Sequence, residues 1–239
     1  MDYLLQKNGT VCNTATSRLN IIKIAAANCL GDKMAHYTGK KNRIARRFGA
    51  NVFGRARNPL LHKPNPPGMH GARRRKKSDY GVQLEEKQKL KAIYGMISEK
   101  QLINYFKKAV KLEANTAQIL AQMLECRLDV VVYRLKFGST IFAAQQLVSH
   151  GHILVDGKKV DRRSFQVSPG MVVSIREKSR GIKAIQEAQD SGMRSVPEYL
   201  SVDKENFSGQ LLEYPSYEQM PWPIEIRLPE ICDFLAHTT

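Results

Sequence analysis

The chain has few of the residues that hold disulfide-rich or membrane-spanning proteins together. Of its 239 residues four are cysteine and one is tryptophan, and no apolar run is long enough to span a bilayer. The cysteines are Cys12, Cys29, Cys126 and Cys232. Their spacing contains no C-x-x-C pair and no zinc-knuckle pattern, and a disulfide framework is not expected in so large and charged a chain. We predict reduced thiols, with Cys126 in the core, in a soluble intracellular protein.

Acidic residues are scarce in one part of the chain, residues 34–91. These 58 residues contain 16 Lys and Arg but only 3 Asp and Glu, a net charge of +13 out of the formal +16 of the whole chain. Like charges concentrated in this way repel one another unless a polyanion neutralises them. Nucleic acid is the polyanion to expect, because neutralising its phosphates releases counterions and drives association. We call residues 34–91 the basic segment.

Regular secondary structure is also scarce in the basic segment. Residues 34–81 contain six glycines and four prolines, which oppose long helices and strands. Apolar residues are few there, so we expect extended, irregular chain that becomes ordered on binding a partner. Residues 1–33 differ in composition and allow a short helix over residues 17–28. They are compatible with a disordered extension, a transit-like presequence or translation from an upstream start codon, and the abrupt change at Met34 favours the last.

Helical patterns begin after the five consecutive basic residues 73–77. Residues 82–94 are predicted to form a helix, in which Glu85 and Lys89 stand at i,i+4. Ser98, with Gln101 three residues later, has the form of a capping box that opens a second helix. Thr116 opens a third. Apolar residues recur at helical spacing in the second and third, which predicts a small helical cluster.

The next stretch predicts two helices followed by a small antiparallel sheet. Leu128, Val131, Val132 and Leu135 have the spacing of an amphipathic helix. Ser139 or Thr140 is the expected cap of a second helix, which ends near Gly151. Asp156-Gly157 is a strong hairpin signal between alternating residues, and further strands are expected over residues 165–167 and 171–175. A helix is expected over 182–190 and strands over 196–202 and 210–214, whereas residues 224–235 show a mixed pattern.

These patterns predict an α+β protein. Residues 1–33 form the extension, and residues 34–95 form the basic arm and the start of the N-terminal domain. Residues 96–126 are the helical cluster, and residues 127–190 are a module of two helices and a small sheet. Residues 191–239 are a C-terminal segment expected to pack on the N-terminal domain.

Several motifs resemble those of one protein family. The hairpin GHILVDGKKV at residues 151–160 resembles the small RNA-binding module found in many translation proteins. The family is narrowed by PPGMHG at residues 66–71, SDYGVQL at 78–84, KQK at 87–89 and VYRLKF at 132–137. Together these motifs resemble bacterial-type small-subunit ribosomal protein four, the S-four family, over residues 34–239. The resemblance does not extend to residues 1–33.

The resemblance implies a structural constituent of the small ribosomal subunit that is a primary binder of 16S ribosomal RNA. Such proteins grip a junction of RNA helices in the 5′ domain and help to nucleate assembly of the 30S body. They lie beside ribosomal protein S-five near the channel through which mRNA enters, and contacts between the two affect decoding accuracy. Some members also repress their own mRNA. The implied fold is a helical N-terminal region with an extended basic arm and an inserted RNA-binding module, and the implied location is the cytoplasmic ribosome.

Cations and helix termini are the expected RNA contacts, because guanidinium groups bind two phosphate oxygens at once and free N–H groups at a helix start donate hydrogen bonds to phosphate oxygens. In the basic segment the predicted contacts are Lys40, Lys41, Arg43, Arg46, Arg47, Arg55, Arg57, His70, Arg73, Arg74, Arg75, Lys76, Lys77, Lys87 and Lys91. In the module they are Arg127, Arg134, Lys136, Ser139, Thr140, His150, His152 and Lys158.

Two departures from the family pattern bear on these contacts. Some members carry a four-cysteine zinc site early in the chain, but this chain has no cysteine between Met34 and Cys126. His150 and His152 lack a third ligand nearby, so we predict no metal and no cofactor. Where the resemblance leads us to expect Ala-Arg-Gln in the second module helix, the chain has Gln145, so one cationic phosphate contact is expected to be missing.

Two other functions compete with this one. Arg127-Leu128-Asp129 echoes the Arg-Leu-Asp motif of pseudouridine synthases, in which the Asp is the nucleophile. Here Asp129 lies within a predicted helix, no second catalytic domain remains, and the chain contains no nucleotide-binding or hydrolase motif of the common kinds. We therefore predict no catalytic residue. A free-standing RNA-binding factor is the other alternative, and the long basic arm argues against it.

Overall fold

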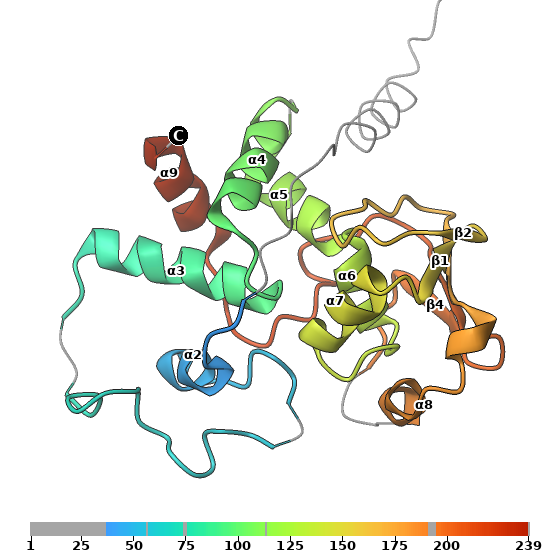
Figure 1. Ribbon diagram of the computed structural model, residues 1–239. Coiled ribbons are helices and arrows are strands. Elements are labelled where there is room, and N and C mark those ends of the chain that lie inside the picture. The colour runs from blue at the N-terminus through green and yellow to red at the C-terminus, as the bar shows by residue number, and fades with distance from the viewer. Residues whose placement is uncertain (1–36, 56, 74–75, 113, 191–194, 239) are drawn as a thin grey trace, which may run out of the picture. The chain divides into compact units, whose positions relative to one another are not determined.

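The computed structural model describes residues 37–55, 57–73, 76–112, 114–190 and 195–238. The helix expected over residues 17–28 lies outside these ranges. The described residues all belong to one compact unit, Ala35–Thr239. Figure 1 shows a group of helices within this unit and a second group in which two helices lie beside an antiparallel sheet. This confirms the predicted α+β class.

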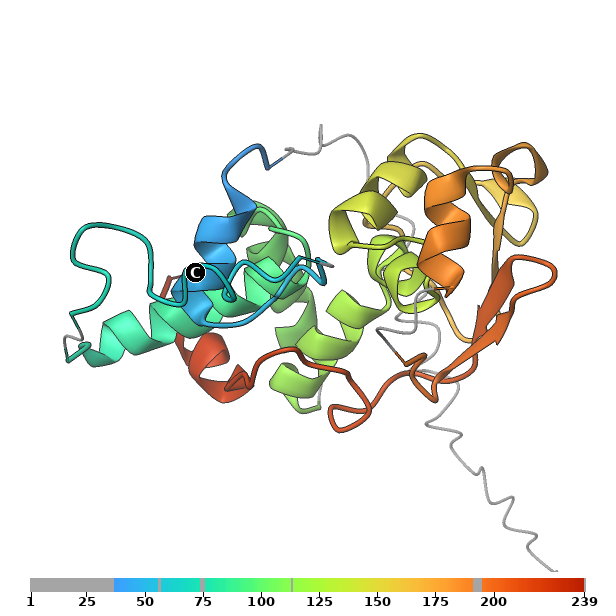
Figure 2. The same cartoon turned by 90° about the horizontal axis from the view of Figure 1, so that it is seen from below.

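The helical part is built around one apolar core. It consists of α2 (Lys41–Phe48), α3 (Asp79–Ile93), α4 (Glu99–Val110), α5 (Thr116–Glu125) and α9 (Leu228–Thr238). Its core includes the fully buried side chains of Leu90, Leu102, Leu120 and Ile231, one from each of α3, α4, α5 and α9. α9 packs against α3, as Figure 2 shows, and also contacts α4 and α5. The C-terminal end of the chain thereby closes the core of the N-terminal helices.

Side-chain caps begin three of these helices. Ser98 caps α4, where its hydroxyl accepts a hydrogen bond from the Gln101 N–H at 3.3 Å, as the capping box predicts. Ser78 caps α3 in the same way. Asn115 caps α5 by accepting from two backbone N–H groups, so Thr116 is the first helical residue. Local sequence thus determines where these helices start.

The second group contains the predicted pair of helices and a five-stranded sheet. Its elements are α6 (Leu128–Arg134), α7 (Ile141–Ser149), β1 (Ile153–Val155), β2 (Lys158–Lys159), β3 (Val172–Ile175), the 3₁₀ helix η1 (Glu177–Ser179), α8 (Lys183–Asp190), β4 (Leu200–Asp203) and β5 (Ser208–Leu211). The strand order is β2-β1-β3-β5-β4, and neighbouring strands are antiparallel. Asp156 and Gly157 have φ of 48° and 77°, as a two-residue hairpin turn requires. The hairpin prediction is confirmed.

The sheet packs closely against α6. Val155 and Val173 point inward, and with Val131 and Leu135 of α6 they form a second apolar core, which also contains Cys126. A Cβ atom at Gly209 would lie 2.4 Å from Cδ2 of Leu135, which follows α6, and 2.9 Å from the backbone oxygen of Ser201, so β5 has no room for a side chain at this position. The prediction that Cys126 is a core residue is confirmed.

The C-terminal region differs from the sequence-based expectation. Its two strands are shorter than predicted and join the sheet of the module through β3, so residues 200–211 do not pack with the N-terminal helices. Residues 224–235 show a mixed pattern but contain most of α9. Pro229 lies in the first turn of α9, where its missing N–H costs no hydrogen bond. The strand expected over residues 165–167, all within the described ranges, is absent, and an isolated antiparallel β-bridge joins Gln166 to Arg127 instead.

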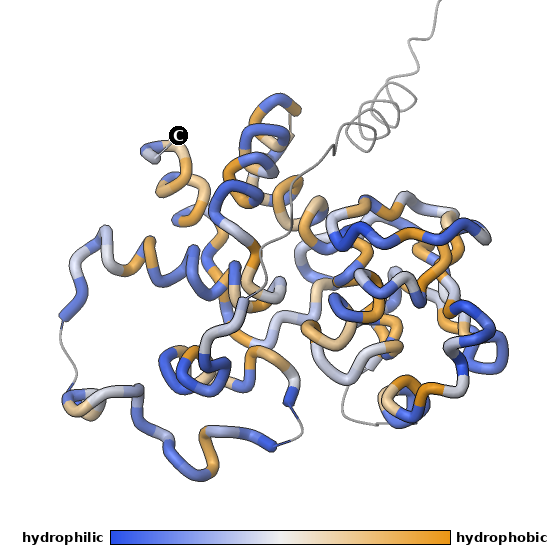
Figure 3. Tube along the Cα trace, in the orientation of Figure 1, coloured by the Kyte–Doolittle hydropathy of each residue, from blue (hydrophilic) through white to orange (hydrophobic). Residues whose placement is uncertain are grey.

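The basic segment also contains more helix than its composition predicts. α2 lies within the stretch expected to be irregular, and it forms because Ile44 and Phe48 pack against the core of the helical part and Ala45 is buried. The loop that follows, residues 49–78, has no helix or strand in its described part. Figure 3 shows that hydrophilic residues predominate along it.

Candidate nucleic-acid interface

The first part of the basic segment presents cations that have no carboxylate partner. Six of those predicted as RNA contacts are exposed and form no ion pair with a described acidic residue. These six, which we call the open cations, are Lys40, Arg43, Arg47, Arg57, Arg73 and Lys76. Arg74 and Arg75 lie outside the described residues, and the His70 side chain is exposed. Because like charges repel, such a surface is stabilised by a polyanion.

Other cations of this part hydrogen-bond to the chain itself. Arg55 Nη1 donates to Asn42 Oδ1 at 2.9 Å, and Arg46 donates to backbone carbonyls of the loop. Lys41 Nζ lies 3.7 Å from the centre of the Phe142 ring. Burial, reinforced by the charge of Arg55, lowers the pKa of Lys41. These three side chains therefore have structural contacts as well as charge.

The end of the basic segment is different, because its cations are paired. Lys87 Nζ lies 2.6 Å and Lys91 Nζ 2.7 Å from the two carboxylate oxygens of Glu99 at the start of α4. Lys77 pairs with Glu85. We predicted all three lysines as RNA contacts, and the structure gives each an internal carboxylate instead. We leave them out of the interface proposed below.

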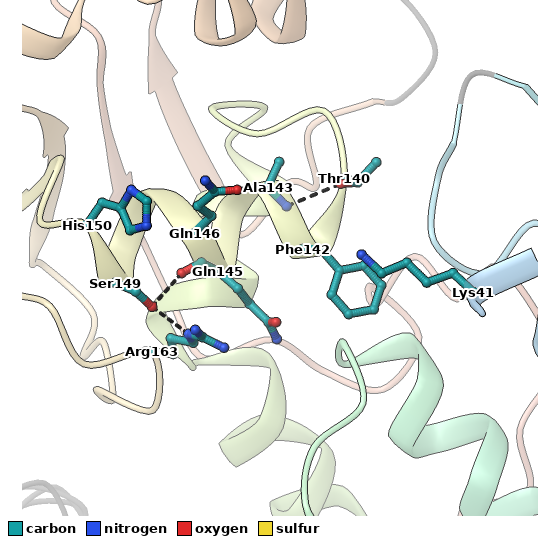
Figure 4. Close-up of a pocket in the computed structure, with 9 residues that line it drawn as sticks. All are labelled: Lys41, Thr140, Phe142, Ala143, Gln145, Gln146, Ser149, His150 and Arg163. Atoms are coloured by element: carbon teal, nitrogen blue, oxygen red, sulfur yellow. Dashed lines mark hydrogen bonds between the residues drawn. The ribbon is translucent and has the colours of Figure 1, made fainter. Parts of the chain in front are cut away.

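A cavity of about 540 Å³ lies along the outer side of α7. Figure 4 shows Lys41 at one end, beside Phe142, and Arg163 at the other, beside Ser149. Arg163 Nε donates to Ser149 Oγ at 2.6 Å. The lining also includes Thr140, Ala143, Gln145, Gln146 and His150, and contains no carboxylate. Arg163 is not among the contacts predicted from the sequence, because only folding brings residue 163 beside α7.

Thr140 lies at the start of α7, where the sequence predicts that backbone N–H groups contact phosphate. Its hydroxyl accepts a hydrogen bond from the Ala143 N–H at 3.2 Å and caps α7. Ser139 is exposed next to it, and Lys136, partly exposed, adopts a left-handed backbone with φ of 63° at the end of α6. The structure therefore brings these three predicted residues to one connection between the two helices.

The hairpin adds cations at the edge of the sheet. Lys158 and Lys159 form β2, and both are exposed. The His150 and His152 rings lie 6.0 Å apart, and His152 Nδ1 is 2.8 Å from Ser179 Oγ. Partial burial, together with the charges of His150 and Arg176, lowers the pKa of His152. These neighbours disfavour the charged form of His152, whose ring is already hydrogen-bonded to Ser179.

Arg127 lies inside the protein rather than on its surface. Its side chain is 2% exposed and donates two hydrogen bonds, of 3.0 and 2.8 Å, to the Asp129 carboxylate, which is fully buried. Burial alone would lower the pKa of Arg127, but the charges of Asp129 and Tyr105 and the hydrogen bonds to them together outweigh burial and raise it. Gln145 Nε2 donates to the same carboxylate at 3.2 Å and to the Gly95 carbonyl. We therefore leave Arg127 out of the interface, and the Gln145 amide, although it lines the cavity, donates its hydrogen bonds to groups inside the protein.

The Arg127–Asp129 pair also bears on the alternative that the chain is a pseudouridine synthase. In a pseudouridine synthase the Asp of the Arg-Leu-Asp motif must reach its substrate. Here Asp129 has no exposed surface, and both its oxygens accept hydrogen bonds from Arg127. Asp129 is a structural counter-charge rather than an accessible nucleophile.

A second buried carboxylate connects the helical part to the module. Glu125 accepts hydrogen bonds from Tyr94 of the helical part, from Arg134 of α6 and from Tyr199, which precedes β4. Burial raises the pKa of both Tyr94 and Tyr199, so each phenol keeps the proton that it donates. Arg134, a predicted RNA contact, is thus occupied by Glu125 and is also left out of the interface.

Among the described ranges no group of three or more His, Cys, Asp or Glu side chains has an arrangement that would hold a metal ion. No described helix combines the length and the apolar composition needed to cross a bilayer.

Comparison with known proteins identifies two consecutive family domains. The model of the ribosomal protein S4/S9 N-terminal domain matches residues 36–125, and the model of the S4 domain matches residues 126–173. Their junction falls where the helical part meets α6. The second match ends before β4 and β5, although both strands belong to the same sheet.

Whole-chain relatives are similar over most of the sequence. A small ribosomal subunit protein uS4 from Protochlamydia amoebophila is 80% identical over 206 residues, which is 86% of this chain and 100% of the relative. The proteins of the same name from Chlamydia muridarum and Chlamydia trachomatis serovar L2 are 59% identical over 209 residues, with the same coverage. Proteins of this family are structural constituents of the ribosome rather than enzymes. The chain belongs to the uS4 family of small ribosomal subunit proteins.

Proposed function

We propose that the chain is a primary binder of 16S ribosomal RNA, which grips the 5′ domain and helps to nucleate assembly of the 30S body. The observation that supports this most directly is the set of six open cations. Nothing in the described part of the chain neutralises them, whereas other cations of the protein do have carboxylate partners. RNA phosphates supply the missing negative charge.

The proposed interface extends from the open cations along α7 to the hairpin. Lys41 and Arg163 flank the cavity on α7, and Lys158 lies on the exposed β2. RNA double helices hide their base edges in a deep groove, so recognition by shape and backbone is expected to dominate. Cations that project from a loop, a helix and a hairpin suit a folded junction better than a straight duplex.

A protein partner and an effect on decoding are also part of the proposal. The resemblance to the S-four family suggests a neighbour, ribosomal protein S-five, and an influence of their contact on translational accuracy. It also suggests binding to the chain's own mRNA, which would use the same cations. These roles rest on family membership.

A salt series tests the proposed RNA interface. The affinity of the purified chain for the 5′ domain of 16S RNA is measured at increasing salt, and the slope of log K against log salt is expected to reach about −4 or beyond, because several phosphates are engaged. Replacing Arg73, Arg74 and Arg75 by Ala should make the slope shallower by about 2 to 3.

The matched control removes three positive charges elsewhere. Lys107, Lys108 and Lys111 lie at the end of α4 and have no carboxylate partner among the described residues. Their replacement by Ala should leave the slope nearly unchanged. If both triple variants change the salt slope by the same amount, residues 73–75 contact RNA no more than the lysines at the end of α4 do. Modification of uridine by the purified protein would restore the enzyme alternative.

A further inference from the structure

One guanidinium group contacts the middle of the loop between α2 and α3, at residues 63–66. Arg46, on α2, donates from Nε to the carbonyl oxygens of Lys63 and Asn65 at 3.1 and 3.0 Å, and from Nη2 to the carbonyl of Pro66 at 3.4 Å. These contacts join residues 17 to 20 positions apart in the sequence. They satisfy three neighbouring carbonyls that no helix or strand pairs.

Little else fixes this part of the loop. The apolar side chains near the contact face solvent, Leu61 being 81% and Met69 94% exposed, so burial of apolar surface contributes little there. Arg57 hydrogen-bonds to His62 within the loop itself, which does not attach the loop to the rest of the protein. Among the described residues, the hydrogen bonds of Arg46 are therefore the main contacts that attach residues 63–66 to α2.

We propose that Arg46 is a positioning residue, which pre-forms the loop so that Arg57 and Arg73 are presented to RNA, and that it does not bind phosphate itself. This inference rests on the RNA-binding function proposed above. A loop ordered before binding loses less conformational entropy in the complex, so Arg46 raises affinity without adding a phosphate contact. Its neighbour Arg47 is exposed and has no carboxylate partner, so it serves as the control.

Replacement by lysine separates the two roles. Lysine keeps the charge but lacks the planar fork that reaches three carbonyls at once. Arg46→Lys should weaken binding to the 5′ domain of 16S RNA by roughly tenfold at every salt concentration, with an unchanged salt slope. Arg47→Gln, which removes a proposed phosphate contact, should lower the slope by about 1. Arg227→Lys, a charge-conserving change at an exposed arginine outside the proposed interface, should bind as the unaltered chain does.

A measurement without RNA tests whether Arg46 attaches the loop to α2. Chymotrypsin cleavage at Leu60 and Leu61 of the free protein should be faster in Arg46→Lys than in Arg47→Lys, while the thermal unfolding of all variants stays the same. The proposal is overturned if Arg46→Lys alters neither the RNA affinity nor the rate of cleavage. It is also overturned if Arg46→Gln loses affinity and Arg46→Lys does not, because charge alone would then explain the effect. If the unaltered chain shows no salt-dependent RNA binding, the proposed function fails, but the cleavage result still decides whether Arg46 orders the loop.

Discussion

The two ends of the basic segment have a similar density of cations but differ in what surrounds them. Residues 40–76 contain 12 Lys and Arg and no Asp or Glu, whereas residues 77–91 contain four Lys and Arg and three Asp and Glu. In the second stretch the fold adds Glu99, which pairs with Lys87 and Lys91. Positive charge alone therefore does not mark an RNA contact. The supply of carboxylates within reach in the fold determines whether a cation stays open.

The same contrast recurs in the module. Lys158 lies exposed on the hairpin, and Arg127, with the same formal charge, lies in the interior against Asp129. The open cations should affect RNA binding and leave stability nearly unchanged, whereas the paired cations should do the reverse. Each prediction below tests one side of this division.

The largest effect is expected when the buried pair is broken. Asp129→Ala leaves the Arg127 guanidinium without a counter-charge inside the protein and removes an acceptor of Gln145. Because an unpaired buried charge is costly, the free energy of unfolding should fall by about 3–5 kcal/mol, as measured by urea denaturation.

The control for this prediction removes both charges together. Arg127→Met with Asp129→Leu replaces the pair by apolar side chains and should recover much of the lost stability. A loss below about 1 kcal/mol for Asp129→Ala would show that Arg127 reaches water or another anion, and would return Arg127 to the candidate RNA contacts.

Features that depend on neighbouring residues could be predicted from the sequence. The Ser98 cap, the Asp156-Gly157 turn and the amphipathic pattern around Val131 are each determined within a few residues, and each is present in the structure. α2 was missed because its short apolar face lies among glycines and cations that favour irregular chain. α9 was missed because Pro229 looks like an interruption of the pattern, although it stands in the first helical turn.

Features that depend on distant partners could not be predicted. Arg127 falls outside the apolar stripe of α6, and only the folded chain brings the Tyr105 hydroxyl within 3.2 Å of its guanidinium. Glu99 reaches Lys87 across 12 residues because α4 turns back toward α3. The candidate site was therefore predicted as a set of cations, and its division into open and paired members required the tertiary structure.

The next effect concerns RNA affinity and compares two pairs of cations. Arg43→Gln with Arg47→Gln removes two open cations and should lower affinity for the 5′ domain of 16S RNA by roughly tenfold near physiological salt, with a salt slope shallower by about 2. Lys87→Gln with Lys91→Gln removes the same charge from a paired site. It should leave the slope unchanged and lower the thermal stability instead. Equal changes of slope in both variants would contradict the division.

The smallest effect is a pH dependence of stability at Glu99. Partial burial alone would raise the pKa of Glu99, but hydrogen bonds from Lys87 and Lys91 outweigh burial and lower it from its usual 4.5. A carboxyl whose pKa is lowered by folding stabilises the protein above pH 4.5, and this contribution is lost as the pH falls through the folded-state value. Glu99→Gln should therefore cost less than about 1 kcal/mol at pH 7, because the site is partly exposed, and nothing at low pH.

Urea denaturation of both proteins at pH 7 and at about pH 3 measures this difference, since the lower value lies below the usual carboxyl range. The exposed Glu218, which pairs with no described cation, provides the control, and Glu218→Gln should change stability little at either pH. A Glu99→Gln penalty that persists undiminished at low pH would mean that packing rather than charge holds Glu99 beside α3. Lys87 and Lys91 would then lack an effective counter-charge and would rejoin the open cations as candidates for RNA binding.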